Sequence, residues 1–202
     1  RKYVARHCPD INNADYTSII DDRSYRRLEE TLDDARGKGA TVINLSGDQP
    51  GNRDQRKFPL HLVLDTTANM TIRSRETFGP ILMVLTYSDP EEVIRYINGQ
   101  DRPLALYPFT TNKELQNRYI DTIMSGGVTV NDALFHVAQH DLPFGGVGAS
   151  GMGHYHGYEG FVAFSKLRPV FYQPGFTAMK YLQPPYGKFA EKVFALMTRL
   201  KS

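Results

Sequence analysis

Hydrophobic positions recur at helical spacing in one long segment near the start of the chain. This spacing predicts an amphipathic helix over residues 22–36, with charged residues on the remaining positions. Two glycines, Gly37 and Gly39, then end the helix, and residues 40–45 predict a short strand. The polar residues 46–57 predict an exposed loop. The apolar face of the helix consists of Tyr25, Leu28, Leu32 and Ala35.

Beyond this loop, apolar β-rich segments alternate with helix signals. The segment 81–87 is almost continuously apolar, as expected for a strand covered on both faces. The capping sequences SDPE at Ser88 and TNKE at Thr111 each predict a helix start. Strand, helix, strand, helix and strand then follow one another with short connections. This order predicts an α/β fold with a mostly parallel sheet and flanking helices. The four strands are expected at residues 60–65, 81–87, 104–110 and 128–131.

The two ends of the chain differ from its middle. The opening RKYVARHC reads like the later turns of an amphipathic helix and contains no initiator Met, so we expect a fragment that is incomplete at its N-terminus. We expect residues 1–172 to form most of one α/β domain and residues 173–202 to form a tail with an amphipathic helix. Docking of this helix onto its own domain or the missing part is favoured over binding to a membrane surface.

Composition narrows the class of protein. The chain has 202 residues, 41% of them hydrophobic and 23% charged, which is typical of a globular protein with a real core. Its net charge is +2, and no basic stripe is interleaved with aromatic residues, so nucleic acid is not an expected partner. A single cysteine indicates a reducing compartment, and we expect a cytoplasmic location. No apolar run is long enough to span a membrane.

The hexapeptide GVGASG, Gly146 to Gly151, matches the dinucleotide-binding pattern G-x-G-x-x-G. That pattern requires a strand directly before it, a helix directly after it and an acidic residue about 20 positions on. Here a long stretch separates the preceding strand from the motif, and residues 152–160 are too rich in glycine to favour a helix. The glycines are instead expected to form a tight loop in which the backbone approaches another group closely.

Histidine and cysteine offer further candidate chemistry. His154 and His156 with Glu159, or His136 and His140, have the residue types of metal ligands, but neither set has an obvious third ligand or a cysteine. Hydrogen bonding within loops is the favoured interpretation, and we expect no metal. The one cysteine, Cys8, is expected to be a bystander, because its sequence neighbour His7 does not face it on a helix.

The segment RETFGP places a carboxylate and an aromatic ring two residues apart. In an extended backbone, residues i and i+2 share a face, so Glu76 and Phe78 would offer one ligand an acceptor and an apolar wall. Spacing alone leaves a second interpretation open, a strand end with a solvated Glu76.

Taken together, three segments resemble the C-terminal part of aldehyde dehydrogenases. They are ETFGPILMVLTY, SGGVTVND and LPFGGVGASGMGHYHGYEGFVAFSK, in the order and with the spacing of that family. The last segment is similar to the class-three type, and DYTSIIDDRSYRRL with QPPYGK is similar to the coniferyl aldehyde dehydrogenase branch. The resemblance implies oxidation of an aldehyde, of aromatic coniferyl type, with NAD or NADP. It also implies a homodimer for the full-length protein.

The resemblance assigns roles to four residues of this chain. Glu76 matches the glutamate that binds the ribose hydroxyls on the nicotinamide side, and Phe78 matches the aromatic residue packed near the nicotinamide. Phe144 matches a residue lining the aldehyde tunnel, and His156 is expected near the tunnel mouth. The family's nucleophile lies in a G-Q-x-C segment that this chain lacks, so the catalytic cysteine and the general-base glutamate are expected upstream of Arg1.

These absences lead to an expectation about the chain by itself. The isolated fragment should not oxidise aldehydes, because it lacks the nucleophile. Two alternatives remain: a non-catalytic α/β module that binds a partner or oligomerises, and, more distantly, a metal hydrolase that uses the histidines.

Overall fold

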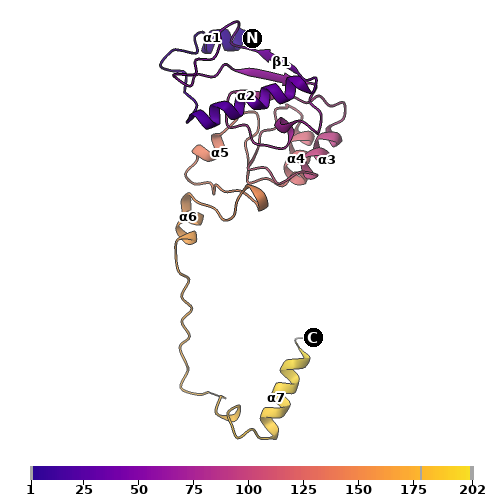
Figure 1. Cartoon of the computed structure of the whole chain (residues 1–202). Coiled ribbons are helices and arrows are strands. Elements are labelled where there is room, and N and C mark those ends of the chain that lie inside the picture. Colours follow the sequence, from indigo (N-terminus) through magenta and orange to yellow (C-terminus); the bar gives the residue numbers. More distant parts are fainter. Residues whose placement is uncertain (1, 178, 201–202) are drawn as a thin grey trace. The chain divides into compact units, whose positions relative to one another are not determined.

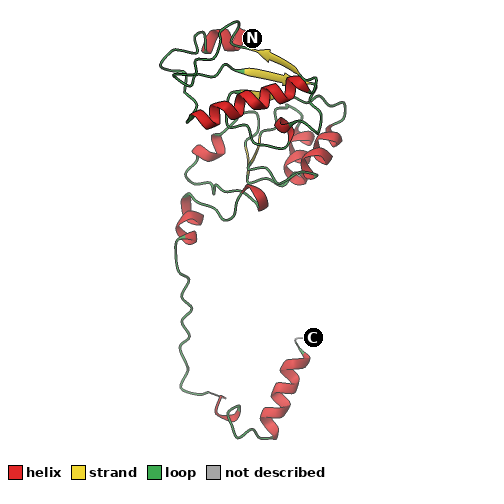
Figure 2. Ribbon diagram, viewed as in Figure 1, coloured by secondary structure: helices red, strands yellow, loops and turns green. Residues whose placement is uncertain are grey.

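The computed structural model describes residues 2–177 and 179–200 and divides into two compact units. Unit 1 is Arg1–Tyr96 and unit 2 is Ile97–Ser202. The order of the elements along the chain is shown in Figure 1, and Figure 2 distinguishes helices from strands. The predicted domain division at residue 172 stays a prediction.

Unit 1 contains one long helix and a three-stranded sheet. The sheet order is β1-β2-β3, in which β2 pairs antiparallel with β1 and parallel with β3. The predicted helix and first two strands are confirmed to within one or two residues. In chain order the elements are α1 (Lys2–His7), α2 (Asp22–Gly37), β1 (Thr41–Asn44), β2 (His61–Leu64), the 3-10 helix η1 (Thr71–Arg73) and β3 (Ile81–Met83).

Helix α2 is capped at its start by the Asp21 side chain and ends at the left-handed Gly39. The Asp21 side chain accepts a hydrogen bond from the Ser24 amide at 2.6 Å and so satisfies a free N–H of the first turn. At the other end, Gly39 takes the left-handed conformation, with φ 91°, that stops the helix. The four predicted apolar residues of α2 are all buried.

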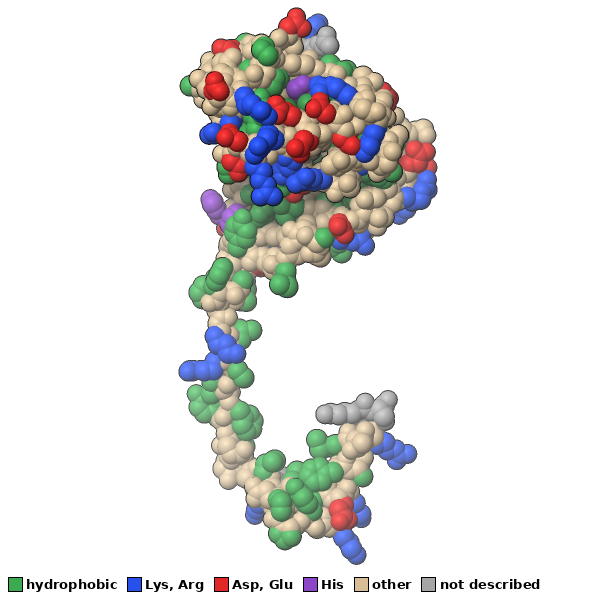
Figure 3. Space-filling view, viewed as in Figure 1, with side chains coloured by type: hydrophobic (Ala, Val, Ile, Leu, Met, Phe, Trp, Pro, Cys, Tyr) green, Lys and Arg blue, Asp and Glu red, His purple; other side chains and the backbone are tan. Residues whose placement is uncertain are grey.

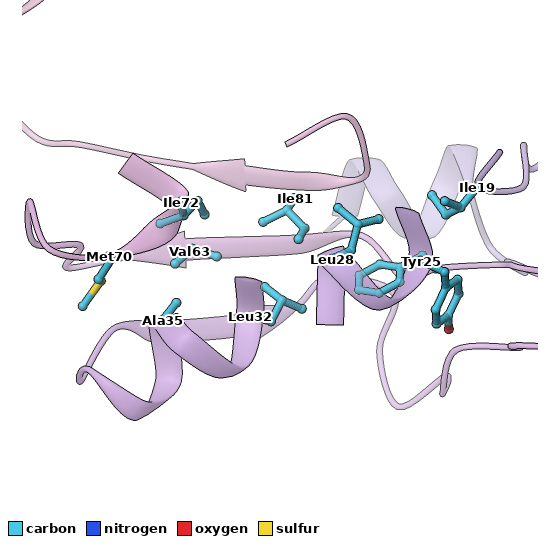
Figure 4. Packing of buried hydrophobic residues seen from close by; sticks show 10 residues of the cluster. Ile19, Tyr25, Leu28, Leu32, Ala35, Val63, Met70, Ile72 and Ile81 are labelled. Atoms are coloured by element: carbon cyan, nitrogen blue, oxygen red, sulfur yellow. The ribbon is translucent and has the colours of Figure 1, made fainter. Parts of the chain in front are cut away.

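The core of unit 1 lies between α2 and the sheet (Figure 4). Leu28 from α2 and Val63 from β2 are both 0% exposed. Burial of each such side chain contributes about 1.5–3 kcal/mol to folding. The other members of the cluster are Ile19, Tyr25, Leu32, Ala35, Phe58, Met70, Ile72 and Ile81.

The strand predicted over residues 81–87 is shorter and more exposed than expected. It ends at Met83, and Leu82 is 57% exposed, so the expectation that both of its faces are covered is wrong for this chain. The physical reason is that, among the described residues, the core with α2 lies on the face of β3 that holds Ile81, while Leu82 points to the opposite face. Ile81 is buried on the core face.

Unit 2 contains a smaller sheet of two parallel strands, β4 and β5. Two of the three strand pairings among the described residues are therefore parallel, which confirms the predicted α/β class, although the strands divide between two sheets. The elements from the end of unit 1 onward are α3 (Pro90–Asn98), β4 (Ala105–Leu106), α4 (Lys113–Thr122), β5 (Gly127–Val128), α5 (Phe135–Ala138), η2 (Gly148–Ser150), α6 (Gly157–Ala163), η3 (Met179–Tyr181) and α7 (Lys188–Arg199).

Both predicted helix starts in the second half are confirmed, with one-residue differences in the capping group. Asn112, rather than Thr111, caps α4 and accepts from the Leu115 amide at 3.1 Å. At α3, the Ser88 hydroxyl donates to Glu92 at 3.1 Å, so the reciprocal carboxylate comes one residue later than predicted. The side-chain oxygen that accepts from the first turn of α3 is that of Asp89, from the Glu91 amide at 3.0 Å, and asparagine and aspartate cap alike because both provide a short side-chain oxygen.

The C-terminal tail carries many exposed apolar side chains (Figure 3). The predicted amphipathic helix is present as α7, and four of its apolar residues are at least 42% exposed: Phe189, Phe194, Leu196 and Met197. Docking of α7 onto its own domain therefore stays a prediction. None of the helices within residues 2–177 and 179–200 has the length and apolar composition needed to cross a bilayer.

Buried His61 should make the stability of unit 1 depend on pH. Burial lowers the pKa of His61 below its ordinary 6.5, with a smaller opposing effect from its hydrogen bond to the Pro59 carbonyl. Above the ordinary pKa His61 is neutral in both states, but below it the unfolded chain binds a proton that the folded chain resists. The free energy of unfolding should therefore fall as pH drops from about 7 to about 5.

Urea denaturation of wild type and His61→Gln at several pH values measures this effect. The variant should lose less stability on acidification than the wild type, and replacement of the exposed His154 by Gln serves as the control. Equal pH dependence in wild type and His61→Gln would contradict the assignment.

Candidate functional site: the Glu76–Pro80 turn and the glycine loop

The RETFGP segment forms a turn between η1 and β3. Glu76 is exposed, and Phe78 is 69% exposed with φ 46°, in the left-handed region. The expectation of an extended backbone is therefore wrong at Phe78. A left-handed residue reverses the chain, so the i, i+2 argument for a shared face does not apply. The side chains of Glu76 and Phe78 are nevertheless both exposed on the turn.

Contacts from α2 hold this turn. The Arg27 side chain donates from Nη2 to the Thr77 carbonyl at 3.0 Å, and its guanidinium carbon lies 5.9 Å from the centroid of the Phe78 ring. Gly79 packs directly on Leu28, where a Cβ on the glycine would come within 2.5 Å of Leu28 Cδ1. The turn is thus seated on the most deeply buried part of α2.

The turn presents groups that can bind a ligand with hydroxyl groups and an aromatic ring. Among the described residues, none donates a hydrogen bond or forms an ion pair with the Glu76 carboxylate. An exposed carboxylate accepts hydrogen bonds from hydroxyl groups, and the exposed Phe78 ring offers an apolar surface. Both predicted residues are available to a ligand.

In unit 2 the glycine loop closes on itself. The Phe144 and Tyr155 backbones exchange two hydrogen bonds, of 2.8 and 2.9 Å, across the base of the loop. Inside it, a Cβ on Gly145 would collide with the Gly153 carbonyl, and a Cβ on Gly146 would collide with the Ser150 carbonyl. These glycines allow the two sides of the loop to approach each other, as expected from the sequence.

The sequence predicts that GVGASG has neither a strand directly before it nor a helix directly after it. The first part of this prediction is confirmed. The preceding strand is β5, ending at Val128, and α5 lies between that strand and Gly146. On the other side residues 157–163 do form a helix, α6, contrary to the expectation from their glycine content. This helix begins six positions after Gly151, too late to point its N-terminus at a phosphate held by the motif.

Phe144, predicted to line the aldehyde tunnel, and His156, predicted near its mouth, lie together in this loop. Their rings stack with centroids 6.1 Å apart, and the Tyr155 ring meets both edge-on, at 5.3 Å from Phe144 and 4.5 Å from His156. The result is an aromatic cluster with Phe144 at its centre. His136 adds a fourth ring, 5.9 Å from Phe144.

The structure also shows the surroundings of His136 and of Cys8. Buried His136 pairs its Nδ1 with the Thr129 hydroxyl at 2.8 Å, which confirms the interpretation of loop hydrogen bonding at this position. Within the described ranges there is no group of three or more potential metal ligands. Cys8 is half-buried, and the ring of His7 packs on Tyr3 at 4.2 Å.

Sequence reasoning missed Arg27 and Tyr155. On the sequence Arg27 looks like any charged residue on the polar side of α2, and no local pattern indicates that it contacts residues about fifty positions away. Tyr155 lies inside the quoted motif, and only the pairing across the loop base identifies it as a neighbour of Phe144.

Comparison with known proteins identifies the family. A sequence model described as the aldehyde dehydrogenase family matches residues 5–170. The chain belongs to the aldehyde dehydrogenase family. Among its relatives, the probable coniferyl aldehyde dehydrogenase of Pseudomonas aeruginosa is 48% identical over 189 residues, which cover 93% of this chain and 39% of that protein. The coniferyl aldehyde dehydrogenase of a Pseudomonas species is 39% identical over 205 residues, covering 100% of this chain and 42% of that protein.

Solved structures agree with this family. The substrate-bound AldH of Staphylococcus aureus matches with a TM-score of 0.77 at 33% identity, over 97% of this chain and 42% of that one. The chain thus spans about two fifths of the length of these aldehyde dehydrogenases. The predicted resemblance to aldehyde dehydrogenases, including the coniferyl branch, is confirmed.

The close approach inside the glycine loop predicts a stability effect. Gly145→Ala should destabilise unit 2 by about 1–3 kcal/mol, because the new methyl group meets a backbone carbonyl that no rotamer change can move. Thermal and urea unfolding measure the loss. Gly175→Ala is the matched control, since nothing lies within 4 Å of a Cβ there. Equal stability of the two variants would refute the close packing.

Proposed function

We propose that this chain serves the oxidation of an aldehyde to a carboxylic acid with NAD or NADP, and that the aldehyde is aromatic, of coniferyl type. The observation that carries the proposal is the Glu76–Pro80 turn, where an unpaired carboxylate and an exposed ring stand together in a chain of the aldehyde dehydrogenase family. The coniferyl names of the Pseudomonas relatives support the substrate class.

The turn supplies the cofactor contacts in this proposal. Glu76 accepts hydrogen bonds from the ribose hydroxyls on the nicotinamide side, and the Phe78 ring packs near the nicotinamide. The bound cofactor supplies a hydride acceptor for the aldehyde carbon. The protein's part is to hold the ribose through a charged hydrogen bond, which is stronger than one to a neutral acceptor.

The aromatic cluster around Phe144 supplies the substrate contact. A ring-bearing aldehyde packs well against Phe144, since offset and edge-to-face arrangements of aromatic rings add to the gain from burial. His156 and Tyr155 hold the Phe144 ring from two sides. We place His156 near the mouth of the aldehyde tunnel on the strength of the family motif.

We further propose that no residue of this chain is the nucleophile. In this family a cysteine thiolate attacks the carbonyl and a glutamate activates the water that releases the acid. Cys8 does not lie in the family's G-Q-x-C segment, and His7, its nearest possible base in sequence, packs on Tyr3 instead. The isolated chain is accordingly inactive.

Glu76→Gln in the full-length enzyme tests the cofactor contact. The variant should lose about 1–3 kcal/mol of cofactor binding, which corresponds to about a 5- to 150-fold rise in KM for the cofactor, because a charged hydrogen-bond acceptor is lost. Steady-state kinetics with an aromatic aldehyde measure this. Folding should be unaffected, since the Glu76 side chain is exposed.

Two controls belong to this experiment. Glu30→Gln makes the same exposed change on α2 and should leave kinetics unaltered, and Cys8→Ser should retain full turnover. Unchanged kcat and KM in Glu76→Gln would remove Glu76 from the site. Turnover by the isolated chain that disappears in Cys8→Ser would overturn the assignment of the nucleophile.

The full-length protein is proposed to be a homodimer. The exposed apolar residues of α7 support this proposal, because a second copy would remove them from water. Light scattering on the full-length protein should give twice the mass of one chain, and a monomer at micromolar concentration would contradict it. The cytoplasmic location stays a prediction.

A further inference from the structure

We propose that Arg27 is a positioning residue for cofactor binding: it holds the Glu76–Pro80 turn in the shape that presents Glu76 and Phe78. The inference rests on the proposed function and adds a residue to it. It is carried by two contacts of one guanidinium with consecutive residues of the turn, Thr77 and Phe78.

The first contact is a hydrogen bond to the turn's backbone. Arg27 Nη2 donates to the Thr77 carbonyl at 3.0 Å, across 50 positions of sequence. Thr77 is the residue between Glu76 and Phe78, and its carbonyl belongs to the peptide unit that joins Thr77 to Phe78, so the hydrogen bond fixes the backbone directly before the ring-bearing residue. A charged donor holds a carbonyl more firmly than a neutral one does.

The second contact is with the Phe78 ring, whose centroid lies 5.9 Å from the Arg27 guanidinium carbon. This distance is within the range of a cation–π interaction. Phe78 is 69% exposed, so little else keeps its ring in place. A planar guanidinium can donate along its edge and meet an aromatic ring at the same time, which the compact ammonium of lysine does less well.

The turn requires such a hold because its backbone is strained. Phe78 has φ 46°, a region that a residue with a side chain enters at a cost and keeps only where its surroundings impose it. Arg27 acts on one side of Phe78, and on the other Gly79 packs on Leu28, the residue next to Arg27 on α2. Two consecutive positions of one helix therefore define the turn.

The guanidinium of Arg27 is not held by a carboxylate in an ion pair among the described residues. Its Nε is buried without a hydrogen-bond partner in that part of the chain. A guanidinium that served only to solvate the surface of α2 would leave its nitrogens in water. Arg26, the preceding residue, is of that kind and is exposed.

The test uses the full-length enzyme with three variants, Arg27→Met, Arg27→Lys and the control Arg26→Met. Methionine keeps an apolar stem but removes the donor and the planar cation. Arg27→Met should raise KM for the cofactor about tenfold, as for other groups that orient a ligand-binding side chain. KM for the aldehyde and the melting temperature should match those of Arg26→Met. Lysine should recover part of the loss.

A double variant separates positioning from direct contact with the cofactor. If Arg27 acts through the turn, Arg27→Met should cost much less in a Glu76→Gln background than alone, because the residue it positions is already lost. Fully additive losses would mean that Arg27 binds the cofactor itself and would overturn the proposal. So would an Arg27→Met enzyme indistinguishable from Arg26→Met.

The remaining outcomes also decide the question. If Arg27→Met fails to fold, Arg27→Lys carries the test, and a lowered melting temperature with unchanged KM for the cofactor shows a purely structural role and overturns the proposal. Failure of the proposed function is distinguishable, since the unaltered full-length protein would then show no turnover with NAD or NADP at all.

Discussion

The packing of α2 on the sheet of unit 1 is the contact on which the rest of this unit depends. Leu28 is fully buried between β2, β3 and the turn, so it serves both the core and the seat for Gly79. Arg27 then reaches the turn because Leu28 fixes the rotation of the helix. The ligand-facing residues are thereby tied to the most stable part of the unit, and a loop placed on a rigid element keeps its geometry better than a free one.

Unit 2 solves a similar problem without a helix. Its glycine loop holds its shape through backbone approach, with Gly145 against the Gly153 carbonyl and Gly146 against the Ser150 carbonyl. The bridge between Phe144 and Tyr155 then sets three aromatic rings side by side. Glycine therefore has a packing function here, although the same letters spell a nucleotide-binding pattern.

Much of this could be predicted because the signals were local. The apolar spacing of α2, the starts of α3 and α4 and the alternation of strands with helices act over a few residues each, and the structure contains them. The strands predicted at residues 104–110 and 128–131 are shorter than expected, as β4 (Ala105–Leu106) and β5 (Gly127–Val128). The length and burial of the strand at residues 81–87 were overestimated, because a continuous apolar run does not show whether another element covers its second face. Among the described residues, Leu82 lies on the face of β3 opposite the core with α2.

The sequence by itself determined the family, the helices α2, α3, α4 and α7, and the residues Glu76, Phe78, Phe144 and His156 as candidates, because motifs and periodicities depend on residues close together in the chain. Only the tertiary structure decided how those residues are held. The left-handed backbone at Phe78, the contact of Arg27 with Thr77 and the stacking of His156 on Phe144 all depend on segments meeting in space. No local pattern encodes such meetings, because the packing of whole elements, not the spacing of neighbours, brings these atoms together.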